Sequence, residues 1–364
     1  MQVFDVDTPA LVIDLDRVED NITSMSARAR AGGVRLRPHT KTHKMPDIAR
    51  LQIDAGASGI TCAKLGEAEV MVDAGFDDIL IAFPIYGDAK LARLQALRKR
   101  ARIQVTLDSL EVARGLGTLG VASGEPVEVF VEVDTGLHRM GLEPGDATVE
   151  LVVRLSEIAG IEIVGFLTHA GHAYGVEDRE QRAALVSREV GDLLSTRHRL
   201  SELGIWVREI SVGSTPTVVQ EAQQRGVTEV RPGTYVFNDT TMIRHGVATQ
   251  STCAAHVIAT VVSRPRPDRF VVDAGTKCLT SDGADQPGWI QFAGREELTM
   301  EFMNEEHGVG RIDVSRGSSL SIGDKVLMIP SHVCPVVNLF DYAISTRGER
   351  VVGQLEVAGR GKVR

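Results

Sequence analysis

The stretch VRLRPHTKTHK, Val34–Lys44, indicates both the fold of this chain and where its chemistry lies. It begins as a short strand with alternating apolar residues and stops at Pro38, because proline lacks the N–H group that a sheet ladder needs. Two histidines and two lysines follow within the next six residues. Polar residues directly after a strand are typical of the catalytic edge of an α/β protein, and a lysine among other cations is a candidate to form a Schiff base.

This strand is the first of a series of short runs rich in valine, isoleucine and leucine, which alternate with amphipathic stretches. The predicted strands lie at 34–37, 58–61, 78–82, 103–107, 127–133, 161–167, 209–212 and 228–230. The predicted helices lie at 46–54, 64–74, 89–99, 110–115, 146–159, 179–203 and 215–223. Such a series over roughly 200 residues predicts a (β/α)8 TIM-type barrel. An open doubly wound sheet is the alternative, but no GxGxxG turn follows the first strand, which weakens it.

The pattern changes after Tyr235, and we place the barrel at 16–245 and a C-terminal antiparallel β domain at 246–364. The second region holds many short strand-like runs separated by proline, glycine and Asp-Gly turns. A further strand is expected at 9–15, followed by a helix that Asp16 caps and that runs to about Ala31. Because residues 1–15 precede this helix, we expect them to add a strand to the β domain.

The composition excludes several classes of function. The chain has 364 residues, 43% of them hydrophobic and 24% charged, which is ordinary for a globular protein. Its net charge of −9 argues against nucleic-acid or anionic-membrane partners, because phosphate groups need clustered lysine and arginine. Its four cysteines form no CxxC pair. The N-terminus lacks the features of a signal peptide and no apolar run reaches 18 residues, so we expect a cytoplasmic protein.

Two glycine turns follow the seventh and eighth predicted strands, where barrels commonly bind phosphate. In the first turn Ser214 and Thr215 offer a hydroxyl cap and Pro216 suits the first position of a helix, whose free N–H groups favour a dianion. The candidate phosphate-binding residues are Gly213, Ser214, Thr215, Gly233, Thr234 and Tyr235. A lysine on the first strand facing a phosphate site predicts pyridoxal 5′-phosphate (PLP), and Arg139 and His169 are the candidate contacts to its ring.

The segment SHVCP, 331–335, is a candidate metal site in the β domain. If it forms a strand, His332 and Cys334 share one face and are able to bind one ion together. A thiolate with an imidazole suits zinc best. The alternative is a buried cysteine that happens to lie beside a histidine.

These residues resemble the D-threonine aldolase and D-serine dehydratase family of fold-type III PLP enzymes, which is related to alanine racemase. The resemblance covers nearly the whole chain. It rests on TPALVIDLD at 8–16, RPHTKTHK at 37–44, GITCAKLGEAEVM at 59–71, THAGHAYG at 168–175, VGSTPT at 212–217, RPGTYVF at 231–237, VVDAGTK at 271–277, EEHG at 305–308 and SHVCPVVNLFD at 331–341.

The resemblance implies a Schiff base on Lys41, the first lysine of RPHTK, and a phosphate cup formed by VGSTPT and RPGTY. It also implies a divalent metal ion (zinc, manganese or magnesium) held by His332 and Cys334, beside the cofactor and on the substrate's β-hydroxyl. Members of the family are usually homodimers, in which the β domain of one subunit closes its partner's site.

The resemblance further implies a small-molecule substrate, a β-hydroxy-D-amino acid. The leading hypothesis is D-threonine aldolase, because His172 occupies the place of a basic histidine in the aldolases. The alternative is a D-serine or D-threonine dehydratase, whose ligand pair Cys334 matches and in which Lys41 removes the α-proton. Less favoured are a racemase, with Tyr342 as second base, and a PLP-binding protein without turnover, which is typically a single barrel.

Overall fold

The structure is a computed structural model that describes residues 1–286, 288–317 and 319–364. The chain divides into two compact units. The barrel unit comprises Ser24–Lys41, Ile48–Gly233 and Lys362–Arg364. The β unit comprises Met1–Thr23, Thr42–Asp47 and Thr234–Gly361.

The barrel unit contains eight parallel strands in the order β2-β9-β8-β7-β6-β5-β4-β3. They are β2 (Arg35–Leu36), β3 (Ile60–Cys62), β4 (Asp78–Ile81), β5 (Arg102–Leu107), β6 (Val127–Glu132), β7 (Ile161–Leu167), β8 (Glu209–Val212) and β9 (Glu229–Val230). A parallel bridge between His39 and Thr61 joins the two ends of this order. The predicted TIM-type barrel is therefore confirmed, with each strand within a few residues of its predicted place.

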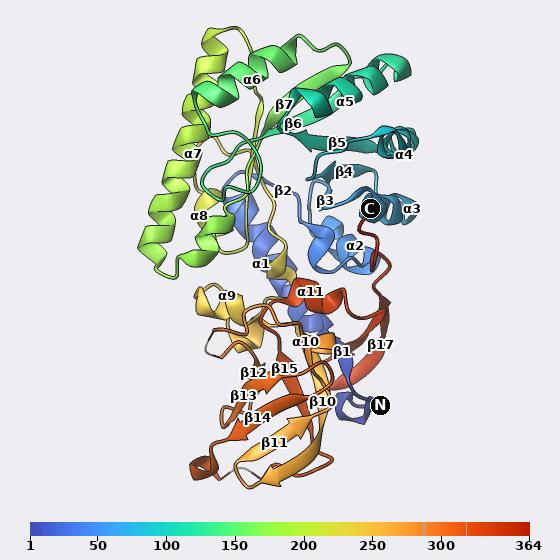
Figure 1. Cartoon of the computed structure of the whole chain (residues 1–364), viewed down its shortest axis with the longest axis vertical. Coiled ribbons are helices and arrows are strands. Elements are labelled where there is room, and N and C mark those ends of the chain that lie inside the picture. The colour runs from blue at the N-terminus through green and yellow to red at the C-terminus, as the bar shows by residue number, and fades with distance from the viewer. Residues whose placement is uncertain (287, 318) are drawn as a thin grey trace. The chain divides into compact units, whose positions relative to one another are not determined.

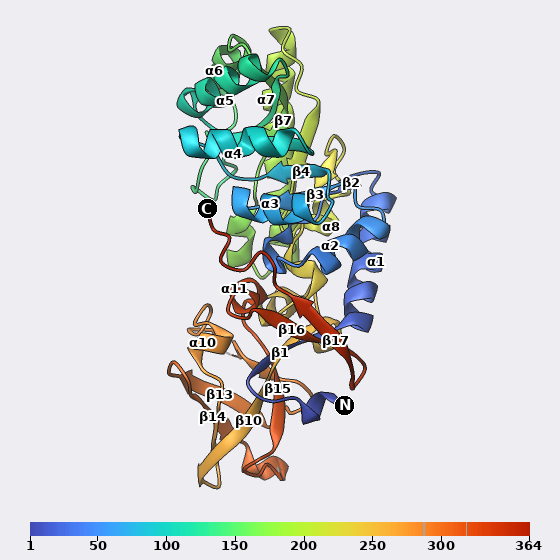
Figure 2. The ribbon, with the colours of Figure 1, turned by 90° about the vertical axis from the view of Figure 1, so that its right-hand side faces the viewer.

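Helices follow the strands and cover the outside of the barrel, as Figures 1 and 2 show for α3 to α7. The helices of the barrel region are α1 (Leu15–Ala31), α2 (Pro46–Asp54), α3 (Leu65–Asp73), α4 (Asp88–Arg98), α5 (Leu110–Ser123), α6 (Asp146–Ser156), α7 (Arg179–Glu202) and α8 (Val218–Glu221). The side chain of Asp14, two residues earlier than the predicted cap Asp16, accepts hydrogen bonds from the backbone N–H groups of Asp16 and Arg17 at the start of α1.

Helix α5 extends eight residues past the predicted end at 115, to Ser123. Glycine within a helix usually weakens it, which is why the sequence suggested a shorter element. Here a Cβ atom on Gly117 would lie 2.6 Å from the carbonyl oxygen of Ala159, and one on Gly120 would lie 1.9 Å from that of Gly160. These glycines therefore let α5 pack directly on the loop before β7.

The β unit is built on a nine-stranded, mostly antiparallel sheet. Its strands are β1 (Ala10–Asp14), β10 (Ala255–Arg266), β11 (Arg269–Val272), β12 (Gln291–Phe292), β13 (Leu298–Met303), β14 (Gly308–Ile312), β15 (Lys325–Ile329), β16 (Tyr342–Arg347) and β17 (Arg350–Glu356). Strand β1 lies between β10 and β16, antiparallel to the first and parallel to the second. The short helices α9 (Thr240–Arg244), α10 (Thr276–Leu279) and α11 (Val333–Val337) complete this unit.

Within the described part of the chain, we find no helix that combines the length and the apolar character needed to cross a bilayer.

Candidate active site

Lys41 lies in a single 3-10 turn, Thr40–Thr42, at the carboxyl end of β2. The hydroxyl of Thr40 donates a 3.0 Å hydrogen bond to the carbonyl oxygen of Thr61, in β3. On the other side, the backbone N–H of His39 donates to the carbonyl oxygen of Pro232, also at 3.0 Å. The turn that carries Lys41 is thus fixed to the ends of both neighbouring strands, as a site at the carboxyl edge of a barrel requires.

Five basic side chains gather at this end of the barrel: His39, Lys41, Arg139, His169 and Arg231, which we call the cationic cluster. Burial, and then the charge of Lys41, lower the pKa of His169 to about 3 and that of His39 well below its ordinary value. Both imidazoles are consequently neutral at physiological pH, although cations surround them.

His169 connects this cluster to the first predicted phosphate turn. Its Nδ1 lies 3.0 Å from the carbonyl oxygen of Gly213, and because a carbonyl only accepts, this nitrogen carries the proton. Gly213 has a φ of +140°, and a Cβ atom there would lie 2.7 Å from the backbone nitrogen of Arg231. Only glycine fits where the ends of β8 and β9 approach so closely.

The helix predicted at 215–223 is present but shorter than expected. The helix α8 starts at Val218 and has four residues, and residues 215–217 before it form a turn, in which the Ser214 carbonyl accepts from the backbone N–H of Val218. Ser214 and Thr215 are buried in this turn, and the hydroxyls of Ser214 and Thr217 lie 2.8 Å apart. The segment is a hydroxyl-lined glycine turn and not the end of a long helix dipole.

The second predicted turn lies at the boundary between the two units. Gly233 is the last residue of the long barrel segment, whereas Thr234 and Tyr235 belong to the β unit. Thr234 and Tyr235 form a buried 3-10 turn with Val236. The hydroxyl of Thr234 lies 3.9 Å from the Sγ atom of Cys334.

His172 lies in a 3-10 turn after β7, Gly171–Gly175. Desolvation lowers its pKa, despite the nearby carboxylate of Asp134, so its ring is neutral at physiological pH. Its Nδ1 atom is buried and has no hydrogen-bond partner among the described residues. With Thr135 and Glu189 it lines a cavity of about 360 Å³ at this end of the barrel.

His332 and Cys334 lie in the β unit at the start of the short helix α11, and not on a strand as their spacing suggested. They still meet, because their side chains hydrogen-bond to each other. Burial lowers the pKa of His332, but the contact with Cys334 and nearby carboxylates outweigh it and raise the pKa to about 9. The Sγ atom of Cys334 also lies 3.3 Å from the hydroxyl of Thr42.

A carboxylate orients the histidine of this pair. The Nδ1 atom of His332 lies 3.0 Å from an oxygen of Asp282, which leaves Nε2 as the nitrogen able to bind a metal ion. Among the described residues, no group of three or more His, Cys, Asp and Glu side chains is placed to hold a metal ion. The two donors that are present, an imidazole nitrogen and a cysteine sulfur, are of the kinds that bind zinc.

The residues of the barrel end fit PLP. PLP carries an aldehyde, a phosphate and an anionic ring oxygen. This end of the barrel offers groups that suit them: a primary amine, two guanidinium groups and a glycine turn whose space a side chain would fill. Of the predicted residues, Lys41, Arg139, His169 and Gly213 come together here.

Two groups of this site, Arg231 and Asp282, are not among the residues predicted from the sequence, and a third, His39, was predicted only to lie beside Lys41. Arg231 and His39 belong to the cationic cluster, and Asp282 orients His332. Arg231 and His39 have a local signal, since each borders a proline turn at a strand end. Asp282 has none, because 50 residues separate it from His332.

Comparisons with known proteins place this geometry in a family. The model of the alanine racemase N-terminal domain matches residues 13–250, and that of a serine dehydratase domain matches residues 254–346. A D-threonine aldolase from Arthrobacter sp. is 34% identical, and the match covers 98% of this chain and 93% of that protein. The crystal structure of D-threonine aldolase from Filomicrobium marinum superposes with a TM-score of 0.94 at 34% identity, covering 100% of this chain and 98% of that one.

A D-threo-3-hydroxyaspartate dehydratase from Delftia sp. (strain HT23) is 35% identical, over 90% of this chain and 91% of that protein. Its solved structures include a cysteine variant in a metal-free form, with a TM-score of 0.89, 33% identity and 98% of each chain covered. The predicted resemblance is confirmed. The chain belongs to the family defined by the alanine racemase N-terminal domain, in the group that carries a C-terminal serine dehydratase domain.

Proposed function

We propose that this protein is a PLP- and divalent-metal-dependent lyase that acts on β-hydroxy-D-amino acids, and that it cleaves D-threonine-like substrates to glycine and an aldehyde. The observation that carries the proposal is the cationic cluster around Lys41, with His169 neutral and hydrogen-bonded to the Gly213 turn. Relatives that match almost the full length are named D-threonine aldolase and D-threo-3-hydroxyaspartate dehydratase, and support the substrate class.

In this proposal the ε-amine of Lys41 holds the cofactor's aldehyde carbon, and the Gly213-Ser214-Thr215 turn holds its phosphate. PLP supplies an electron sink for the bond that breaks at the substrate's Cα atom. Arg139 and Arg231 place positive charge beside this group, and the neutral rings of His39 and His169 add none. The positive charge of the two arginines therefore favours an anionic cofactor, and neither histidine needs to be protonated for this.

The pair His332 and Cys334 would hold the metal ion, with Asp282 fixing the histidine ring. A divalent ion supplies a Lewis acid for the substrate's β-oxygen. The contacts of Cys334 support this role, since its Sγ atom lies near the hydroxyls of Thr42 and Thr234, which follow Lys41 and Gly233 in the chain.

Cleavage of the Cα–Cβ bond needs a base for the β-hydroxyl, and His172 is the candidate. A histidine whose pKa is lowered is neutral at physiological pH and able to accept that proton. Dehydration instead needs a base for the α-proton, which Lys41 would provide. Cys334 favours this second reaction, because the family's dehydratases carry such a histidine–cysteine pair.

The products of D-threonine distinguish the two reactions. The protein, loaded with PLP and a divalent ion, is incubated with D-threonine, and glycine plus acetaldehyde are measured beside 2-oxobutanoate plus ammonia. We expect the first pair. Formation of only the second pair would establish the dehydratase, and formation of L-allo-threonine, the Cα epimer of D-threonine, without dependence on metal would establish a racemase. Absence of every product, with PLP bound, would overturn the lyase assignment.

We also propose, from the family resemblance, that the active form is a homodimer; sedimentation at micromolar protein concentration tests this, and a monomer that retains full activity would contradict it.

A further inference from the structure

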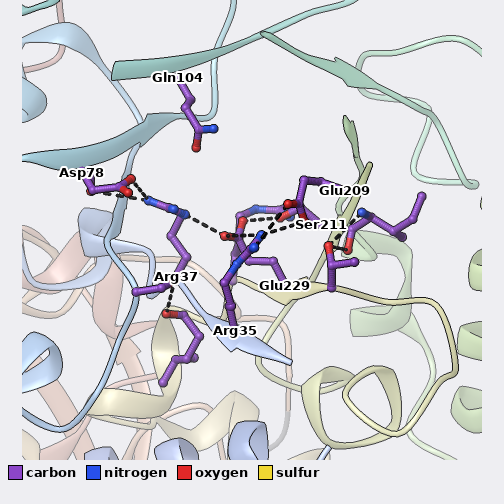
Figure 3. Close-up of polar contacts among 12 residues, drawn as sticks. Arg35, Arg37, Asp78, Gln104, Glu209, Ser211 and Glu229 are labelled. Atoms are coloured by element: carbon purple, nitrogen blue, oxygen red, sulfur yellow. Dashed lines mark hydrogen bonds and ion pairs between the residues drawn. The ribbon is translucent and has the colours of Figure 1, made fainter. Parts of the chain in front are cut away.

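A hydrogen-bonded column of buried polar side chains runs through the barrel unit toward the cationic cluster (Figure 3). Arg37 donates through Nε to Glu229 at 2.8 Å and through Nη1 to Asp78 at 2.5 Å. The hydroxyl of Ser211 donates to the other oxygen of Glu229 at 2.7 Å. That hydroxyl in turn accepts from Nη1 of Arg231 at 2.7 Å. Asp78 and Glu229 are the first residues of β4 and β9, whereas Arg231 follows the last residue of β9. The column therefore runs from the amino-terminal end of the strands to their carboxyl end.

Four side chains of this column are almost inaccessible to water, whereas that of Asp78, at one end, is 25% exposed. The exposed fraction is 3% for Arg37, 1% for Glu229, 0% for Ser211 and 5% for Arg231. A buried polar group that loses its partner costs more than an exposed one, because water does not replace the lost bond. Each link of the column is therefore strongly favoured.

The direction of every bond is fixed by the chemistry of the partners. A guanidinium only donates and a carboxylate only accepts, whereas a hydroxyl has one proton to donate. Since Ser211 donates that proton to Glu229, its lone pair faces Arg231. Glu229 thus sets the orientation of the hydroxyl, and Arg37 sets the position of Glu229.

Arg231 is the member of the column that belongs to the cationic cluster. The positive charge of Arg231 lowers the pKa of His39 and that of His169, so its guanidinium lies close to both rings. Its guanidinium is held by two strong bonds, one to Ser211 and one from Nη2 to the carbonyl oxygen of Thr168 at 2.6 Å. If the hydrogen bond to Ser211 were lost, the buried guanidinium of Arg231 would keep the bond to Thr168 as the remaining one of these two, with other cations nearby.

We propose that Ser211 and Glu229 are positioning residues for Arg231. Through these two residues, the ion pairs of Arg37 at the opposite end of the barrel fix the position of Arg231 in the cofactor site. This inference rests on the proposed function, because it requires the cofactor to bind beside Arg231. It explains why Arg37, in the RPHTKTHK stretch, faces Glu229 and not the cofactor.

The test measures binding of PLP to the cofactor-free protein by absorbance titration, together with the position of the visible band of the bound cofactor. We expect Ser211→Ala to weaken binding about tenfold, the change typical of a lost hydrogen bond to a charged group, and to shift the band. Glu229→Gln keeps one acceptor oxygen and should weaken binding less. Ser211→Thr retains the hydroxyl and should restore both binding and band position.

Arg102→Gln is the matched control, because Arg102 bonds to Asp78 at the solvated end of the column and to Glu128 outside it, and its own side chain is 52% exposed. It should leave PLP binding and the band unchanged. Wild-type affinity and band position in Ser211→Ala would overturn the inference, as would an equal loss in Arg102→Gln. If Ser211→Ala does not fold, wild-type binding by a folded Glu229→Gln would also overturn it. If the wild-type protein binds no PLP, the proposed function fails instead.

Discussion

The two ends of the barrel use charge in opposite ways. At the amino-terminal end of the strands, acids and bases alternate and pair: Arg35 with Glu209 at 2.6 Å, Arg102 with Glu128 at 2.7 Å, and Arg208 with Glu162 at 2.7 Å. At the carboxyl end, Lys41, Arg139 and Arg231 gather with two neutral histidines.

The pairs at the amino-terminal end of the strands affect stability, whereas the charges at the carboxyl end affect function. Paired charges at a solvated rim contribute little each and define no ligand. At the carboxyl end Arg139 lies 3.6 Å from the buried carboxyl group of Glu132, whose pKa burial raises to about 7, so the three cations are only partly compensated and favour a further anion. Changes at the two ends should therefore be detected by different measurements.

The largest expected effect comes from Lys41 at the carboxyl end. Lys41→Ala removes the amine that would hold the cofactor, and should reduce lyase activity by about a thousandfold or more and abolish the visible absorbance of the bound cofactor. Its unfolding midpoint without cofactor should change little. Lys64→Ala is the control, because this lysine lies over the ring of Phe83, away from the cluster. Persistent visible absorbance in Lys41→Ala would show that another lysine anchors the cofactor.

The next effect comes from Arg37, the buried base at the paired end. Arg37→Met removes the close, buried partner of Glu229 and leaves it the longer 3.7 Å contact with the half-exposed Arg35, and should lower the free energy of unfolding by about 3–5 kcal/mol. Urea unfolding followed by circular dichroism measures this change. A loss below about 1 kcal/mol, as at an exposed pair, would show that Arg37 does not hold the column.

A smaller effect comes from the buried carboxyl groups near the cationic cluster. Burial raises the pKa of Glu132 and that of Glu189 to about 7, from an ordinary value of 4.5. Between these two values the folded state binds more protons than the unfolded state, so stability should fall as pH rises from about 4.5 to 7. Each group should contribute on the order of 1–3 kcal/mol to that fall.

Glu209 at the paired end provides the contrast. Hydrogen bonds and the charge of Arg35 outweigh burial and lower its pKa, so its contribution is present above pH 4.5 and is lost on acidification. Urea unfolding of the cofactor-free protein at several pH values separates the contribution of Glu209 from those of Glu132 and Glu189. Glu132→Gln should flatten the fall between pH 4.5 and 7, and an unchanged slope would mean that Glu132 ionises normally.

The smallest effect is expected for Arg102 at the exposed rim. Its partners Asp78 and Glu128 are partly solvated, so Arg102→Gln should change the free energy of unfolding by about 0–1 kcal/mol, and less at high salt. Unfolding at low and high ionic strength tests this. A large, salt-independent loss would place Arg102 with the buried column.

Much of the barrel could be predicted because its signals are local. Each strand is a short apolar run, and each helix repeats its apolar face along consecutive residues, so eight strands were identified near their true places. The errors occur where packing overrides local preference. The glycines of α5 weaken a helix on its own but allow close contact with Ala159 and Gly160, and the turn at Ser214 shortens α8 to four residues.

The candidate site divides in the same way. The sequence alone determined the order of the motifs, the place of Lys41 after the first strand of the barrel and the His332–Cys334 spacing, because these depend on residues close together in the chain. Only the tertiary structure decided that Asp282 orients His332, that Arg231 joins the cationic cluster, and that Ser211 connects Arg231 to Glu229. Such contacts join residues that lie on separate elements, and packing brings them together without leaving any periodic trace in the sequence.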